Sequence, residues 1–372
     1  MRKPDKKKTC SSGIYKSPGR PSLSGDESSG EKRGVDGSDS DPAASGPSDS
    51  EGGDGAQLTQ YFFSLTPDRI MEAFHQAGIN CQPAVRFLNS LENRVACVED
   101  EEGRRWVAKF YRPCRHSIEA LDEEHCFLKE LRDEGMPVIP PLELKNGRGT
   151  TGSIAGIYFA VFPHCPGRPP DEIDPAKATL LGEMLAKLHN VGERRAFLRR
   201  DVWSPGSLGE SDLEVLSRAM PPEIWSRYER SARKLLGFLA LRLGRTARLR
   251  IHGDFHRGNL LWGAAGPVIV DFDDTTMGPP VQDFWMMVSG RDAEAVSLRE
   301  AMIESYERFR PFDLGSLELI EALRAFRYVH YAAWLTARRD DPAFVRVLDD
   351  FGSRSYWRNE LEELDSQLES FL

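Results

Sequence analysis

One stretch of the sequence gathers residue types that are able to do chemistry. Residues 249–274 read LRIHGDFHRGNLLWGAAGPVIVDFDD, in which Asp254 precedes Asn259 by five positions and an apolar strand ends at Asp271. Phosphoryl transfer needs a carboxylate that positions the attacking hydroxyl, and oxygen ligands for a Mg²⁺ ion that bridges the phosphates. An acid, an amide oxygen and a second acid in this order suit that reaction.

The spacing matches the catalytic segments of protein kinases. HGD at 252–254 followed by Asn259 has the spacing of the H-R-D-L-x-x-x-N loop, and DF at 271–272 stands where the D-F-G aspartate would lie. Upstream, WVAK at 106–109 is similar to the V-A-I-K strand. Each motif alone is weak, whereas their common order and spacing favour a kinase-like ATP site.

Two other chemistries fit the same stretch less well. The sequence VIVDFDDT at 268–275 also matches the D-x-D-x-T signature of haloacid-dehalogenase-type phosphatases, but helical sequence follows it instead of further strands. A zinc site at His252, Asp254 and His256 lacks a downstream cluster that would complete its ligands. Phosphoryl transfer from ATP is therefore the favoured interpretation.

Two groups of elements must position these residues. Strands are predicted at 84–88, 94–99, 105–110 and 157–162, and helices at 67–77, 117–134, 222–243, 292–310 and 316–339. Another helix begins at Asp174-Pro175, after the proline-rich connection at 163–170. This order predicts an α+β, bilobal, protein-kinase-like fold with a small β-rich N-terminal lobe and a larger, mainly helical C-terminal lobe.

Composition sets the expected boundaries of these regions. Residues 1–57 contain almost no large apolar side chains, so they cannot bury enough surface to fold and are expected to be a disordered tail. The ATP-binding lobe is expected at 58–165 and the catalytic and substrate lobe at 166–372. The candidate residues therefore lie on both lobes.

Charge and cysteine usage argue against several classes of protein. The 372 residues carry a formal net charge of −9, which argues against a nucleic-acid partner. The 6 cysteines include no C-x-x-C pair, which favours reduced thiols over disulfides or zinc. No apolar run approaches the roughly 20 residues of a membrane span, and the basic N-terminal segment lacks the apolar core of a secretory signal. We expect a cytoplasmic monomer without membrane contact.

The predicted helix after the strand of Lys109 offers this lysine two carboxylates. Glu124 lies three residues after Leu121 and four before Leu128, on the packed face of the helix. Glu123 is rotated about 100° away from that face. We expect Glu124 to pair with Lys109, with Glu123 as the less favoured partner.

Seven short segments carry a family resemblance. They are LNSLENRV (88–95), VAKFYRP (107–113), EEH (123–125), YFAVFP (158–163), HGDFHRGNLLW (252–262), VDFDD (270–274) and GPPVQDFW (278–285). Together they resemble the aminoglycoside-phosphotransferase and choline-kinase superfamily, whose members share the protein-kinase fold. Within it, they are most similar to bacterial stress-response serine/threonine protein kinases. The resemblance covers roughly residues 60–360.

The resemblance implies a role for each candidate residue. Asp254 would be the catalytic base that accepts the proton of the substrate hydroxyl, and Asp271 would be catalytic as well. Asn259 and Asp271 would hold Mg²⁺. The groups that bind ATP would be Ser90, Lys109, its partner Glu124 and a hinge at 160–165. His252 is expected to be structural, and Asp283 to anchor backbone rather than to bind metal.

The implied function is an ATP- and Mg²⁺-dependent serine/threonine protein kinase of a bacterial stress response. Its partners would be ATP and proteins with serine or threonine acceptors. The alternative is a kinase of small-molecule hydroxyl groups, of the aminoglycoside, choline or homoserine type, because the catalytic loop is common to both classes.

The sequence departs from the protein-kinase pattern at two places. The turn at 89–93 contains no glycine, so phosphate contact there would depend on backbone N–H groups and on the Ser90 hydroxyl. Only twelve positions separate Asp271 from Asp283, which leaves no room for a long, phosphorylated activation loop. We therefore expect activity that does not depend on phosphorylation of such a loop.

Overall fold

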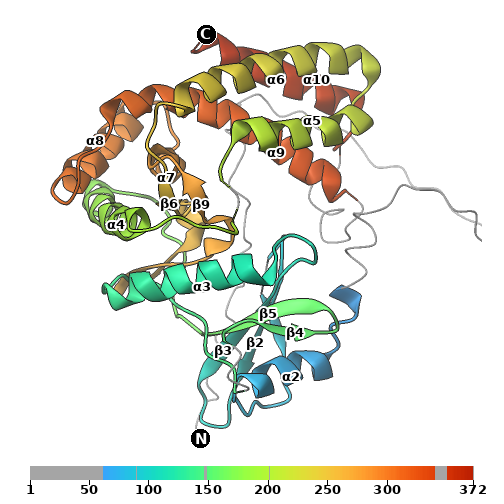
Figure 1. Ribbon diagram of the computed structural model, residues 1–372, viewed down its shortest axis with the longest axis vertical. Coiled ribbons are helices and arrows are strands. Elements are labelled where there is room, and N and C mark those ends of the chain that lie inside the picture. Colours follow the sequence, from blue (N-terminus) through green and yellow to red (C-terminus); the bar gives the residue numbers. More distant parts are fainter. Residues whose placement is uncertain (1–61, 89, 146–148, 201, 340–349, 372) are drawn as a thin grey trace, which may run out of the picture. The chain divides into compact units, whose positions relative to one another are not determined.

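The computed structural model describes residues 62–371 except 89, 146–148, 201 and 340–349 (Figure 1). The tail expected at 1–57 lies outside these described residues. The described chain forms the expected bilobal α+β fold, in which a five-stranded sheet is followed by a mainly helical region. Among the described residues, no helix is both long and apolar enough to cross a membrane.

In the part of the chain that the structure describes, the N-terminal lobe is built on one antiparallel sheet with helices packed beside it. Its elements are α2 (Pro67–Gln76), β1 (Arg86–Leu88), β2 (Arg94–Glu99), β3 (Arg105–Phe110), α3 (Ile118–Asp133), β4 (Gly152–Ile154) and β5 (Ile157–Pro163). The strand order is β1-β2-β3-β5-β4, and each neighbouring pair is antiparallel. Lys109 is aligned with Val95 of β2 and with Ala160 of β5, so the lysine lies on the central strand.

Local signals and apolar packing explain these elements. The Thr66 side chain accepts the N–H of Arg69 at 3.4 Å and caps α2, which begins with Pro67 as predicted. One face of the sheet buries Phe110 and Phe159 in a common core with residues of α2. Burial of such aromatic side chains contributes about 1.5–3 kcal/mol each. The sheet is therefore a firm support for Lys109.

Helix α3 packs on both lobes. Its N-cap is Ser117, whose hydroxyl accepts the N–H of Ala120 at 3.2 Å. Toward the C-terminal end, Phe127, Leu128 and Leu131 belong to the large core of the helical lobe. Figure 1 shows α3 between the sheet and the helices of that lobe. The helix is therefore held by the lobe that carries the 249–274 segment.

The C-terminal lobe consists of helices around two short strand pairs. Its helices are α4 (Pro175–Glu193), α5 (Pro205–Ala219), α6 (Pro222–Leu243), α7 (Val281–Met287), α8 (Ala293–Glu307), α9 (Ile320–Ala337) and α10 (Arg354–Glu369). Strands β6 (Leu249–Ile251) and β9 (Thr276–Gly278) form one antiparallel pair, and β7 (Leu260–Gly263) and β8 (Gly266–Ile269) form the other. Three 3₁₀ turns complete the lobe: η1 (Arg257–Asn259), η2 (Phe272–Asp274) and η3 (Leu314–Leu319).

Helix α5 was not predicted from the sequence. Gly206 and Gly209 lie in its first half, and glycine lowers helix propensity by about 1 kcal/mol relative to alanine. The helix forms because it packs on α6 and α9 and buries Leu213 and Leu216 in the core. Tertiary packing here outweighs local propensity.

Candidate active site

A buried aspartate holds the backbone of the candidate catalytic loop. Asp283 of α7 is completely buried, and its two oxygens accept the N–H groups of His252 and Gly253, each at 2.9 Å. His189 of α4 contacts the same carboxylate at 3.2 Å. Gly253 has a φ of 85°, and a Cβ at this position would collide with the carbonyl of Asp274. The predicted anchoring role of Asp283 is confirmed by these contacts.

The carboxylate of Asp254 has different partners on its two oxygens. Oδ2 is 3.2 Å from both Asn259 Nδ2 and His256 Nε2, which belong to the same loop. Oδ1 accepts a hydrogen bond from Arg327 Nη1 of α9 at 3.1 Å. Burial opposes ionisation, but Arg327 and His256 hold the pKa of Asp254 well below its usual range. The side chain is therefore ionised at neutral pH and able to accept from a hydroxyl.

Backbone hydrogen bonds fix the tautomers of the two loop histidines. The N–H of Gly258 donates to His256 Nδ1 at 2.9 Å, so the proton of the neutral ring lies on Nε2, which donates to Asp254. The N–H of Asp254 likewise donates to His252 Nδ1 at 3.3 Å, and His252 Nε2 donates to the carbonyl of Val270 at 3.1 Å. His252 is structural, as expected. His256, for which the sequence predicted no role, orients the carboxylate.

The β7–β8 hairpin brings Asn259 next to the segment that carries Asp271. Beyond the last pair of this hairpin, the N–H of Val270 donates to the carbonyl of Asn259 at 3.0 Å. Asn259 is buried, and its Nδ2 donates to the carbonyl of Asp254 at 2.9 Å, so Oδ1 is the acceptor atom of this amide. The structure therefore brings together the three residues that the sequence motif selected.

Asp271 adopts a backbone conformation that is uncommon for a residue with a side chain. Its φ of 62° and ψ of 66° lie in the left-handed region. Such a conformation persists where the surrounding structure enforces it, and it gathers at functional sites. Here β9 follows directly and pairs with β6, and α7 begins at Val281, so the segment up to Asp283 contains no long loop.

Lys109 extends from the central strand to two aspartates of the C-terminal lobe. Its Nζ is 2.8 Å from Asp271 Oδ1 and 3.0 Å from Asp273 Oδ1. Burial favours the neutral amine, but Asp271, Asp273 and Glu124 hold the pKa of Lys109 well above its usual range. The ammonium is therefore charged and positioned beside Asp271, one of the two predicted metal ligands.

Glu124 has a different direct partner from the one expected. Its position on the buried face of α3 agrees with the predicted helical phase. However, its carboxylate forms an ion pair with Arg200, whereas the ion pairs of Lys109 within the described residues are with Asp271 and Asp273. The expected direct ion pair between Glu124 and Lys109 is therefore replaced by one between Glu124 and Arg200. The buried guanidinium of Arg200 comes from a distant loop. Burial raises the pKa of Glu124, and Arg200 and Lys109 oppose that shift.

Arg200 links α3 to the segment after Asp271. Its Nε donates to the carbonyl of Ala120 at 3.1 Å, and its Nη1 donates to the carbonyls of Asp273 and Thr275 at 2.8 and 3.1 Å. The side chain of Arg200 is only 3% exposed. Its contacts fix the helix and the aspartate segment relative to each other. No sequence motif indicated this role, because the partners lie more than 70 positions away.

Glu123 supports the same loop from the other side. Its carboxylate accepts the backbone N–H groups of Leu198, Arg199 and Arg200, at 2.7, 2.9 and 3.0 Å. Glu123 therefore positions the loop that carries Arg200. The expectation that it is the less favoured partner of Lys109 agrees with these contacts.

The turn without glycine contacts the C-terminal lobe through side chains. Ser90 Oγ accepts the N–H of Asn93 at 3.3 Å, and Asn93 Nδ2 donates to Asp273 Oδ2 at 3.1 Å. Glu92 accepts two hydrogen bonds from Arg338 at the end of α9, at 2.7 and 2.8 Å. The turn is thus fixed over the aspartate segment, with the Ser90 hydroxyl near its own backbone. The predicted contact of Ser90 with ATP remains a prediction.

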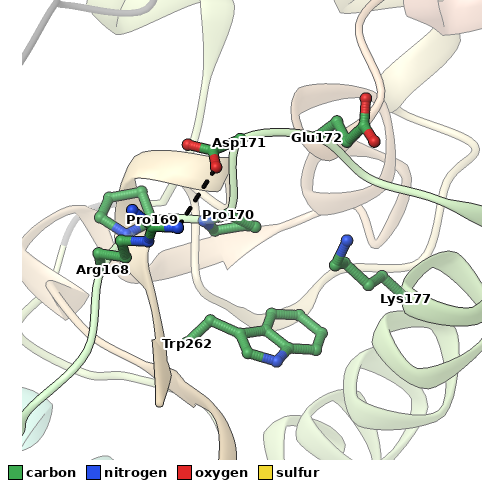
Figure 2. Close-up of a pocket in the computed structure, with 7 residues that line it drawn as sticks. All are labelled: Arg168, Pro169, Pro170, Asp171, Glu172, Lys177 and Trp262. Atoms are coloured by element: carbon green, nitrogen blue, oxygen red, sulfur yellow. Dashed lines mark ion pairs between the residues drawn. The ribbon is translucent and has the colours of Figure 1, made fainter.

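A pocket of about 350 Å³ lies beside the segment that follows the predicted hinge (Figure 2). Its lining residues are Arg168, Pro169, Pro170, Asp171, Glu172, Lys177 and Trp262. The backbones of Arg168 and Trp262 are paired, which joins the connecting segment to β7. None of the predicted site residues lines this pocket.

The donors of the predicted metal site are oxygens alone. Among the described residues, no group of three or more His, Cys, Asp or Glu side chains is placed to hold a metal ion. Asn259 and Asp271 would supply two oxygen ligands, and the side chain of Asp271 is 51% exposed. Mg²⁺ commonly uses one or two protein oxygens and completes its octahedron with waters and phosphates. The residues present fit this ion.

The sequence pattern of the phosphotransferase enzyme family, APH, matches residues 84–320. The chain belongs to this family. It is 39% identical over 304 residues to stress response kinase A of Salmonella typhi, covering 80% of this chain and 91% of that protein. The identity to stress response kinase A of Escherichia coli (strain K12) is 37% over 306 residues, covering 80% and 90%. A relative from Salmonella typhimurium, 39% identical over 304 residues, is named serine/threonine protein kinase RdoA.

Solved structures of phosphotransferases share the fold. Amicoumacin kinase hAmiN, in complex with AMP-PNP, Ca²⁺ and Ami, has a TM-score of 0.68 at 19% identity, covering 82% of this chain and 96% of that chain. A microcompartment-associated aminopropanol kinase has a TM-score of 0.63 at 21% identity, covering 82% and 98%. The family match and the 39% identity to stress response kinase A of Salmonella typhi identify the chain as a phosphotransferase related to that kinase.

Proposed function

We propose that this phosphotransferase is an ATP- and Mg²⁺-dependent kinase of serine and threonine residues in proteins. The observation that carries the proposal is the convergence of Asp254, Asn259 and Asp271 at one hairpin, with Lys109 bound to Asp271 at 2.8 Å. The same four residue types do this work in protein kinases. The names of the relatives at 37–39% identity support a role in a bacterial stress response.

Asp254 is the proposed acceptor of the substrate hydroxyl proton. Its carboxylate is ionised and held by Asn259 and His256, so the hydroxyl meets a fixed oxygen. Phosphoryl transfer has a loose transition state, in which positioning of the nucleophile matters more than strong basicity. A carboxylate of low pKa is suited to this task, because it orients the hydroxyl and takes the proton late.

Asn259 and Asp271 are the proposed Mg²⁺ ligands. When bound, Mg²⁺ would offset the negative charge of the phosphates of ATP. The left-handed backbone of Asp271 and the hydrogen bond between Val270 and Asn259 keep these two residues at the same end of the β7–β8 hairpin, just before β7 and just after β8. Lys109 is already charged and held in place by its ion pairs. With ATP bound, its ammonium group would contact the phosphates as well as Asp271.

Ser90 and the hinge at 160–165 are the proposed contacts for the rest of the nucleotide. Ala160, the first residue of the proposed hinge, is aligned with Lys109 in the sheet, so the hinge starts beside this lysine. Glu124 acts on Lys109 through its charge rather than by a direct ion pair, and we propose Asp273 as the direct partner.

A protein acceptor is favoured over a small molecule by the relatives. The relative named serine/threonine protein kinase RdoA is 39% identical to this chain, and the match covers 91% of that protein. The structural neighbours named for amicoumacin and aminopropanol are only 19–21% identical, so they support the fold but not the acceptor. A kinase of small-molecule hydroxyl groups is therefore the competing outcome of the test.

The test is transfer of labelled γ-phosphate from ATP to a generic protein, an aminoglycoside, choline and homoserine, with Mg²⁺. We expect label on serine and threonine of the protein. Asp271→Asn should raise the Mg²⁺ concentration needed for half-maximal rate, because a charged ligand becomes neutral. Label on a small molecule but not on protein would replace the proposed acceptor. A covalent phosphate on Asp271 would overturn the mechanism.

A further inference from the structure

Arg327 of α9 contributes a positive charge at the place where the acceptor must bind. Its Nη1 donates to Asp254 Oδ1 at 3.1 Å and lies 3.7 Å from the sulfur of Met286. The side chain is 35% exposed, so the guanidinium is reached by solvent and by a ligand. No sequence motif selected this residue, and the proposed function assigns it no role.

The partners of Asp254 define the side from which a hydroxyl approaches. Oδ2 already has Asn259 Nδ2 and His256 Nε2 at 3.2 Å, both from its own loop. Within the described residues, Oδ1 accepts a hydrogen bond from Arg327, which lies on another element, α9. A hydroxyl that donates to this carboxylate therefore binds at Oδ1, next to the guanidinium.

Two further basic side chains on or just after α9 are paired with acids. On α9, His330 contacts Asp212 at 3.0 Å, and Arg338 pairs with Glu92 at 2.7 Å. The ion pair of Arg327 within the described residues is with Asp254, the carboxylate that the acceptor hydroxyl would use. An acceptor hydroxyl at Oδ1 would share this carboxylate with Arg327, and once Asp254 takes the hydroxyl proton, Arg327 loses this counter-charge.

We propose that Arg327 is a specificity-determining residue that selects acceptors with a carboxylate or another anionic group next to the hydroxyl. It would disfavour acceptors with an ammonium group at that place. This inference rests on the proposed kinase function and names its acceptor class as serine or threonine in acidic sequence. Charge complementarity of this kind favours the correct partner and penalises like charges.

The reaction leaves the anionic group of the acceptor unchanged. The acceptor oxygen forms a bond to the γ-phosphorus of ATP, and the bond from that phosphorus to the β–γ bridging oxygen breaks. ADP leaves with that electron pair, and the hydroxyl proton goes to Asp254. Arg327 meanwhile binds the acidic group of the acceptor, so the guanidinium keeps an anionic partner throughout.

The experiment compares three peptides that share one serine and differ only in its neighbours, which are glutamate, glutamine or lysine. We measure kcat/KM for each peptide with ATP and Mg²⁺, at about 0.05 M and about 0.5 M salt. The variants are Arg327→Gln, Arg327→Glu and, as a control of equal charge change, Arg308→Glu. Arg308 follows α8, and its guanidinium is 3.6 Å from Glu183.

We expect the wild type to prefer the glutamate peptide over the lysine peptide by at least about tenfold at low salt. The preference should shrink at high salt, vanish in Arg327→Gln, reverse in Arg327→Glu and persist in Arg308→Glu. Equal use of the three peptides, or preference for lysine, by an active wild type overturns the inference and leaves the kinase function intact. If the wild type phosphorylates no serine at all, the proposed function itself is wrong. If both Arg327 variants are inactive, the preference of the wild type among the three peptides and the salt dependence of that preference still test the inference.

Discussion

The candidate catalytic loop at 252–259 and helix α3 hold their acidic residues in different ways. In the loop, Asp254 receives two of its three side-chain partners from residues within five positions, Asn259 and His256. In α3, Glu124 pairs with Arg200, which lies 76 positions further along the chain. The loop is therefore organised mainly by local sequence and the helix by distant contacts.

The acidic residues of these two regions have different roles. The loop holds the partly exposed carboxylate of Asp254, and the buried Asp283 supports the loop backbone. The acids of α3 are used internally, because Glu124 and Glu123 both serve the loop that carries Arg200. The expected consequence is that substitutions in the loop reduce turnover, whereas substitutions around α3 reduce stability.

The largest expected effect is on turnover. Asp254→Asn should lower kcat about 10²–10⁴-fold, because a neutral amide does not accept the hydroxyl proton. The dissociation constant of ATP and the melting temperature should stay close to those of the wild type. Steady-state kinetics and nucleotide titration check this, with Asp171→Asn as a control whose side chain is 85% exposed. A kcat equal to that of the control would remove Asp254 from the mechanism.

The second expected effect is on stability. Arg200→Met leaves the carboxylate of Glu124 buried without its partner, which should lower the free energy of unfolding by about 3–5 kcal/mol. The double variant Arg200→Met with Glu124→Met removes both charges and should recover much of that loss. Urea unfolding of both variants measures this coupling. Equal instability of the single and double variants would mean that the pair itself is not what α3 depends on.

The third expected effect is a pH dependence of stability that originates in α3. Burial, and then Lys109 and Arg200, lower the pKa of His125 to about 3. Between that value and the pKa of about 6.5 in the unfolded chain, the unfolded state binds more protons, so stability rises with pH. The contribution of His125 is complete above about pH 6.5, and about 2 kcal/mol of it should be lost on acidification to about pH 5.

Removal of the titrating ring isolates this contribution. His125→Gln keeps a polar group beside Tyr111, whose hydroxyl is 2.9 Å from His125 Nε2. The wild type should lose about 2 kcal/mol more than this variant when urea unfolding is compared at about pH 7 and pH 5. Parallel curves for the two proteins would show that His125 is not buried in its neutral form.

The sequence predicted the local part of the site and missed its distant part. The spacing of Asp254 and Asn259 was informative because one short hairpin fixes both residues and the start of the Asp271 segment. Arg200 and Arg327 carried no comparable signal, since the chain has 49 lysine and arginine residues and partner choice depends on the tertiary fold. The helical phase correctly predicted that Glu124 is buried, but it could not predict that its ion-pair partner is Arg200.

The smallest expected effect decides which carboxylate orients Lys109. Asp273 is 3.0 Å from Lys109 and only 4% exposed, and it also pairs with Arg115, whereas the direct ion pair of Glu124 is with Arg200. Asp273→Asn should therefore raise the KM for ATP about tenfold, which corresponds to the loss of one charge-assisted contact. Glu124→Gln keeps a hydrogen-bond acceptor for Arg200 and should change the KM less. Kinetics of the two variants at equal fractions of folded protein give the answer. A larger rise in Glu124→Gln would restore the pairing of Lys109 with Glu124 in the nucleotide-bound protein, and α3 would then serve catalysis as directly as the loop does.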